Sequence, residues 1–229
     1  MDSRTPSLTS PVDRIRSISE PGVSLFEVPL VHATPETLEG LATLEDSFEE
    51  AEVRIETWPQ PGWRPVVAGT GNEGGVTEGE FEVYRSGQLV LGRNHAVDGY
   101  YVTGWFDDPA TASEEVTPRD PSRVLVSEAN YHPDGGQVFS PRDADPFVAL
   151  LARAGDDVTP GDFRAYYCDG RHGINLLPGT WHQPLYPLGE RVVFDDKQGR
   201  VHACIAVDFV GEFGVYLAVP LIQPPSATD

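Results

Sequence analysis

Turn signals rich in glycine and proline interrupt this chain at short intervals. They include Pro-Asp-Gly-Gly at 133–136, Thr-Pro-Gly-Asp at 159–162, Leu-Pro-Gly at 177–179 and the polar run at 195–199. The 229 residues contain 23 glycines and 21 prolines, a share well above the usual ~12%. Because such turns leave room only for short elements, the chain favours an all-β fold over a helical one.

Short aromatic and β-branched runs lie between these turns, as β-strands require. They cover 80–84, 88–92, 100–106, 124–130, 146–152, 163–169, 191–194, 201–210 and 214–222. Many short strands in one chain predict a mainly β fold, either a double-sheet jelly roll or a closed antiparallel barrel. Folds of this kind hold small-molecule sites in the mouth, lined by side chains that point inward.

One helix is predicted near the N-terminus. Thr34 suits the capping position, Pro35 the first turn, and Glu36 and Glu39 the positive end of a helix. Apolar residues then recur at helical spacing at Leu38, Leu41, Leu44 and Phe48. We therefore expect a helix over 34–48.

The ends of the chain are polar. We expect residues 1–24 to form a flexible tail, 25–222 a single domain and 223–229 a second tail. No uninterrupted apolar stretch is long enough to cross a membrane, and the first 24 residues lack the apolar core of a secretory signal. Two cysteines, Cys168 and Cys204, favour buried thiols over a disulfide framework. We expect a cytoplasmic protein.

The formal net charge is −20, from 16 Lys and Arg against 36 Asp and Glu. This balance argues against partners held by bulk positive charge, namely nucleic acids and anionic membrane surfaces. An anionic small substrate remains compatible, because distant charges are screened beyond ~8 Å and one local cation outweighs them.

Two histidines stand beside turns at strand ends. His132 precedes the 133–136 turn, Gln137 follows it, and His182 follows the turn at 177–179. Inward-facing histidines at strand ends suit acid–base chemistry, although a chain with six histidines also offers such pairs by chance. No histidine lies two residues after His132, so the ligand pattern of redox-metal sites in jelly rolls is incomplete. A divalent ion bound by His132 and His182 is the alternative.

Two charged residues each allow two interpretations. Asp208 shares one face of its strand with Cys204, where it is either solvated or turned into the mouth as a partner of His182. Arg164, near the start of its strand, is either a surface charge or a two-pronged receptor for a carboxylate.

The segment around these residues resembles the ureidoglycolate lyase family, enzymes of ureide breakdown with the cupin fold. The resemblance rests on His-Pro-Asp-Gly-Gly-Gln-Val-Phe-Ser-Pro at 132–141, Phe-Val-Ala-Leu-Leu-Ala at 147–152, Phe-Arg-Ala-Tyr at 163–166, Ala-Val-Asp at 206–208, and Gly173, Asn175, Trp181, His182 and Pro184 within 170–184. It covers much of the C-terminal half and fits only loosely before residue 123.

The resemblance implies a cupin-type double-stranded jelly roll with long Gly/Pro-rich loops, a homodimer, and cleavage of a small ureido hydroxy-acid to glyoxylate and urea. It assigns acid and base roles to His132 and His182, with Asp208 fixing a histidine tautomer. Substrate binding falls to four residues: Gln137, Arg164, Asn175 and Trp181. The substrate is then a small anion, and any ion polarising its hydroxyl would bind His132 and His182.

The chain departs from the family pattern at two places. Leu176-Leu177-Pro178 replaces an expected Tyr-His-Arg run, and His182-Gln183-Pro184 replaces His-His-Pro. Because these changes make one wall of the site more apolar, two alternatives stay open. One is a related lyase, isomerase or hydrolase acting on another small hydroxy-acid or amide. The other is a non-catalytic cupin that senses a ligand.

Overall fold

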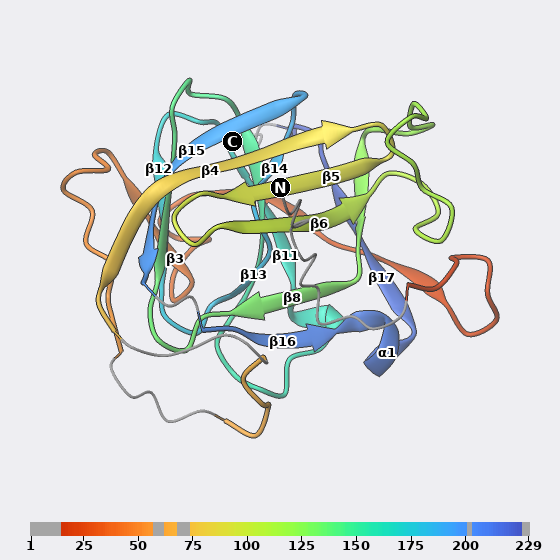
Figure 1. The fold of residues 1–229 in the computed structure, drawn as a ribbon, viewed down its shortest axis with the longest axis horizontal. Helices are drawn as coiled ribbons and strands as arrows, with labels where there is room; N and C mark the ends of the chain where they lie inside the picture. The colour runs from red at the N-terminus through yellow and green to blue at the C-terminus, as the bar shows by residue number, and fades with distance from the viewer. Residues whose placement is uncertain (1–14, 57–61, 68–73, 201–202, 226–229) are drawn as a thin grey trace, which may run out of the picture.

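The computed structural model describes residues 15–56, 62–67, 74–200 and 203–225. Its strands form two sheets, shown in Figure 1. In spatial order the larger sheet contains β1 (Ser24–Glu27), β17 (Val215–Pro220), β7 (Arg123–Val126), β6 (Gly99–Trp105), β5 (Leu89–Asn94), β4 (Val76–Ser86), β15 (Arg191–Gly199), β9 (Gln137–Pro141), β12 (Gly173–Leu176) and β3 (Ala42–Glu45).

The smaller sheet faces the larger one across the core. Its order is β16 (Ile205–Asp208), β8 (Glu128–Tyr131), β13 (Trp181–His182), β10 (Phe147–Ala152), β11 (Arg164–Cys168) and β2 (Leu30–His32), with β14 (Tyr186–Pro187) also paired to β10. A 3-10 turn, η1 (Pro160–Asp162), and a short helix, α1 (Phe209–Phe213), complete the described elements. The predicted mainly β fold is therefore confirmed. Within the described ranges the strands make two sheets rather than one closed barrel.

Aromatic side chains join the two sheets. The rings of Phe147 on β10 and Phe194 on β15 are 5.1 Å apart, and Phe139 on β9 lies 5.6 Å from Phe194. Because side chains alternate along a strand, these contacts identify the inner faces. Phe147, Ala149 and Leu151 lie inward on β10, and Phe194, Asp196 and Gln198 lie inward on β15.

The predicted helix over 34–48 is wrong. Residues 35–41 form turns, and 42–45 form β3, which pairs with β12. The capping signal was real, since Thr34 Oγ1 accepts a hydrogen bond from Thr37 N at 3.2 Å. Gly40 then adopts a φ of 74°, a left-handed conformation that ends a helical turn. Leu38 and Leu41 are buried in the core from turns rather than from a helix face.

The predicted turn at 195–199 is also wrong. β15 continues through it to Gly199, paired with β4 on one side and β9 on the other. Polar residues extend this strand because its last inward side chains, Asp196 and Gln198, face other buried polar groups rather than solvent. Most other predicted strands are present, although 124–130 divides into β7 and β8. Of the predicted strand 201–210, residues 201–202 lie outside the described residues, 205–208 form β16, and α1 begins at Phe209.

The part of the predicted N-terminal tail that the structure describes contacts the larger sheet. Tyr216 Oη donates to Arg16 O at 2.7 Å, and Ser17 Oγ donates to Asp108 Oδ2 at 2.6 Å. Cys168 and Cys204 are buried free thiols. No helix among the described residues is both long enough and apolar enough to span a bilayer.

Candidate active site

His132 and His182 lie against each other between the two sheets. His182 belongs to β13, and His132 follows β8, the neighbouring strand, where Asn130 is paired with His182. The two ring centroids are 4.9 Å apart with their planes at 66°. Both side chains are almost completely buried, with 6% and 4% of their surfaces exposed.

Each histidine directs Nδ1 at a backbone carbonyl. His132 Nδ1 lies 3.0 Å from Ala203 O, and His182 Nδ1 lies 2.8 Å from Thr180 O. Since a carbonyl oxygen accepts only from an N–H, both rings carry a proton on Nδ1, and the neutral His182 ring keeps its lone pair on Nε2.

Burial favours the neutral forms of both histidines. It lowers the pKa of His182 to about 3, helped by the charge that His132 carries when protonated. Burial also lowers the pKa of His132, but the Ala203 carbonyl, Asp134 and Gln137 oppose that shift. More neighbouring groups counter the effect of burial at His132 than at His182, although the pKa of His132 is still lowered.

The larger sheet contributes a buried set of amides and a carboxyl. Gln137 Nε2 donates to Asp196 Oδ1 and to Gln198 Oε1, both at 2.7 Å. Asn94 Nδ2 donates to Gln198 Oε1 at 2.8 Å. Register explains this meeting, because Gln137 on β9 is paired with Gln198 on β15, and Asp196 is the next inward residue on that strand.

Asp196 is fully buried, and among the described residues no hydrogen bond reaches its Oδ2. Burial raises its pKa to about 7, against the opposing effect of Gln137 and Asn94. Asp134, in the 133–136 turn, is also fully buried, and no described group hydrogen-bonds to either carboxyl oxygen. Burial raises the pKa of Asp134, whereas the charge of His132 lowers it.

Contacts continue from these amides round to the histidines. Cys204 Sγ lies 3.4 Å from His132 Nδ1. Tyr101, on β6, belongs to the same region: burial raises the pKa of its hydroxyl, and the charges of Cys204 and Asp196 raise it further. Interaction with Gln137 raises the pKa of His132 against the effect of burial. We call His132, His182, Gln137, Asp196, Tyr101 and Cys204 the inner polar cluster.

Among the described residues, the donor set around the histidine pair does not fit a resident divalent ion. The rings offer two nitrogens, whereas protein sites for divalent ions generally use three or more protein ligands. In the part of the chain that the structure describes, a group with metal-ligand spacing lies elsewhere. It consists of Glu80 and Glu82 on β4 and His95 just after β5, whose ligand atoms lie within 4.8 Å of one another. Arg142 and Arg191 pair with those two glutamates.

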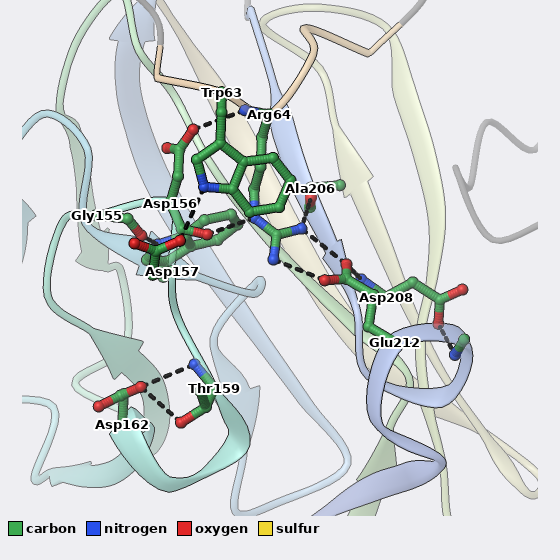
Figure 2. Close-up of polar contacts among 12 residues, drawn as sticks. Trp63, Arg64, Gly155, Asp156, Asp157, Thr159, Asp162, Ala206, Asp208 and Glu212 are labelled. Carbon is green, nitrogen blue, oxygen red and sulfur yellow. Dashed lines mark hydrogen bonds and ion pairs between the residues drawn. The ribbon is translucent and has the colours of Figure 1, made fainter.

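Trp181 and Asp208 lie outside the inner polar cluster. Trp181 points to the outer face of its sheet, where Nε1 donates to Gly155 O at 2.8 Å and Arg64 lies over the ring at 5.7 Å. Asp208 caps α1, because its Oδ1 accepts from Val210 N at 3.0 Å and Gly211 N at 2.8 Å. Figure 2 shows Asp208 at the start of this helix, close to Glu212 and Arg64. The carbonyl of Thr180, not Asp208, fixes the tautomer of His182.

Arg164 and Asn175 also lie apart from the histidines. Asn175 Nδ2 donates to Glu45 Oε1 at 3.2 Å and to Glu52 O at 3.1 Å. Arg164 is exposed in a cleft of about 660 Å³, whose charged lining also includes Arg153, Asp156, Asp157 and Asp162. The histidine pair does not line this cleft. Of the seven predicted site residues, His132, His182 and Gln137 come together.

Sequence reasoning missed Asp134, Asp196 and Gln198. Asp134 lies inside the turn that identified His132, so its polarity was attributed to the turn. Asp196 and Gln198 were assigned to a hairpin, although the alternation of Val192, Phe194, Asp196 and Gln198 is that of a strand with one inward face. That alternation was the available signal.

Two histidines, a glutamine and a carboxyl are thus buried between facing sheets, and shifted pKa values of this kind gather at functional sites. Residues 113–208 match the family model described as ureidoglycolate lyase. They contain His132, His182, Gln137 and Asp196. The resemblance predicted from the sequence is confirmed over this segment.

Curated relatives carry the same description. The chain is 37% identical over 83 residues to the ureidoglycolate lyase of Stutzerimonas stutzeri (strain A1501), covering 35% of this chain and 49% of that protein. It is 36% identical over 86 residues to that of Pseudomonas paraeruginosa (strain DSM 24068 / PA7), covering 37% and 50%. The chain thus spans about half the length of the curated relatives it matches.

Proposed function

We propose that this chain is a ureidoglycolate lyase-like enzyme that cleaves a small ureido hydroxy-acid to glyoxylate and urea at the inner polar cluster. The facing pair of buried histidines within the matched segment is the observation that carries the proposal. We further propose that the two sheets are a jelly roll of the cupin type, which places such a site between its sheets.

The proposed reaction is an elimination with one base and one acid. One ring takes the proton from the carbinol oxygen of the substrate, and the electrons of the O–H bond form the carbonyl of glyoxylate. The bond between carbon and the ureido nitrogen breaks, its electron pair stays on nitrogen, and the other ring supplies a proton there. Urea leaves, and proton transfer between the adjacent rings restores the starting state.

Arg164 is the proposed receptor for the substrate carboxylate. Leu151 on β10 is paired with His182 on one side and with Arg164 on the other. Directly paired residues share a sheet face, and neighbouring strands are ~4.8 Å apart. Arg164 therefore lies on the same face as His182, roughly 10 Å away between Cα atoms. The guanidinium of Arg164 is the local positive group that a chain of net charge −20 needs to receive an anion.

The test replaces His182→Gln and measures glyoxylate and urea released from ureidoglycolate. We expect turnover to fall by about 10²–10⁴ because one partner in proton transfer is lost. His172→Gln is the matched control, since His172 lies in the same matched segment but is exposed and pairs with Asp46. A folded His182→Gln protein with full turnover would refute the proposal. Release of ammonia in place of urea would identify a hydrolase.

Leu176 supports a second candidate, a related lyase, isomerase or hydrolase for a less polar hydroxy-acid or amide. It is buried, and its register partner on β9 is Gln137. An apolar side chain beside this amide offers no hydrogen bond to a second polar substrate group. Comparing turnover of ureidoglycolate with that of hydroxy-acids lacking the ureido group separates the two candidates.

A further inference from the structure

The side-chain amides beside the histidine pair form a series of hydrogen bonds, and a backbone N–H fixes which way the first amide faces. Ala96 N donates to Asn94 Oδ1 at 2.9 Å, which assigns the oxygen of that amide. Asn94 Nδ2 therefore points at Gln198 and donates to its Oε1. Because a peptide N–H is only a donor, this first link cannot be reversed by flipping the amide.

The orientation then passes to Gln137. Gln198 Oε1 accepts from both Asn94 and Gln137, so Gln137 presents its nitrogen on this side. Asp196 Oδ1 accepts a hydrogen bond from the same nitrogen. A flipped Gln137 would place its oxygen 2.7 Å from two other acceptors, with one of them charged when Asp196 ionises. Both N–H bonds of Gln137 are thus used, and its Oε1 is left for His132.

The two histidines consequently differ. His132 contacts two groups that accept hydrogen bonds, the Ala203 carbonyl and Gln137. Two acceptors match a ring with protons on both nitrogens, which is the acid form. His182 has one such contact, Thr180 O, and no described group hydrogen-bonds to its Nε2. That lone pair suits the base.

We propose that Asp196 is a positioning residue which, through Gln137, makes His132 the acid and His182 the base of the pair. Asn94 and Gln198 complete this relay, and all four side chains are at most 2% exposed. The inference rests on the proposed function for its reaction. The hydrogen-bond state that it assigns to His132 does not depend on the substrate.

Two readouts test the relay in Asp196→Asn. Asparagine at 196 removes the charged acceptor of Gln137 Nε2, while Gln198 Oε1 still accepts from the same nitrogen. Gln137 is then held by one strong contact fewer. We expect kcat on ureidoglycolate to fall about 10–100-fold, as for lost outer-shell partners, while KM changes less than about threefold because Asp196 does not touch substrate. The ring-nitrogen NMR signals of His132 should shift, and those of His182 should shift less.

Asp195→Asn is the matched control. Asp195 is the next residue on β15, points to the opposite face and pairs with Arg142 at 2.6 Å. We expect wild-type kinetics and wild-type His132 signals. Asp196→Glu keeps a carboxyl acceptor and should retain more activity than Asp196→Asn. If Asp196→Asn does not fold, Asn94→Ala removes the other end of the relay and should shift the same His132 signals.

The outcomes separate this inference from the proposed function. Unchanged His132 signals in folded Asp196→Asn or Asn94→Ala protein would overturn the relay. So would a rise in KM equal to the loss in kcat/KM, since that points to binding rather than proton transfer. If the His132 signals shift in Asp196→Asn while the wild-type protein has no lyase activity, the relay is supported and only the proposed reaction is overturned.

Discussion

Asp208 shows at the scale of one residue how a capping carboxylate resembles a catalytic one in sequence. Its carboxylate accepts from two backbone N–H groups of α1. We expect Asp208→Ala to lower the free energy of unfolding by about 1 kcal/mol through loss of this cap, measured by urea denaturation. Lyase turnover should remain, because the described contacts of Asp208 do not include His182.

Asp208→Ser is the control for that interpretation, because a serine hydroxyl also caps helices. It should restore most of the stability lost in Asp208→Ala and keep turnover at the wild-type level. A stable Asp208→Ser protein without turnover would instead place this carboxylate in the reaction, as the sequence hypothesis had it.

At the scale of elements, β10 connects the histidine pair with the cleft. Leu151 is paired with both His182 and Arg164, so these two residues lie on β13 and β11, the strands on either side of β10, and share one sheet face. We expect Arg164→Ala to raise KM for ureidoglycolate about 10–100-fold with little change in kcat, because a two-pronged contact to a carboxylate is lost. Arg171→Ala, an exposed arginine paired with Asp169, should leave both constants unchanged. A loss confined to kcat would contradict the binding role.

Elements also explain what the sequence could and could not predict. Apolar strands such as 147–152 were predicted correctly, because the apolar run, its residue composition and the turn residues on either side all indicate a strand. The segment 34–48 was mistaken for a helix, since Leu38, Leu41 and Leu44 have helical spacing while Gly40 ends the turn and β12 draws 42–45 into a sheet. His132, His182 and Gln137 were found beside local turns. Asp196 was missed because its hydrogen-bond partner, Gln137, comes from β9, and only long-range register brings the two together.

At the scale of the whole molecule, the buried titratable groups make stability depend on pH in opposing directions. Asp196 has a folded pKa of about 7 against 3.8 as a free side chain, so between these values the folded state holds a proton that the unfolded state has released. The contribution of Asp196 to the free energy of unfolding therefore falls as pH rises from 3.8 to about 7. His182, with a pKa of about 3 against 6.5, does the reverse. Between those values the unfolded state binds the extra proton, and stability rises with pH.

Removing one of these two groups should reveal the effect of the other on the pH dependence of the free energy of unfolding. In Asp196→Asn the falling contribution is gone, so the free energy of unfolding should rise with pH more steeply than in wild type, by about 1.4 kcal/mol per pH unit for one proton. His182→Gln should change the slope by a similar amount in the opposite sense. Urea denaturation at a series of pH values from 3.8 to 6.5, where both groups contribute, measures both slopes. Asp195→Asn is expected to follow wild type. If Asp196→Asn and wild type have parallel curves, Asp196 is ionised in the folded protein at every pH tested. Its burial would then be offset by partners other than Gln137 and Asn94.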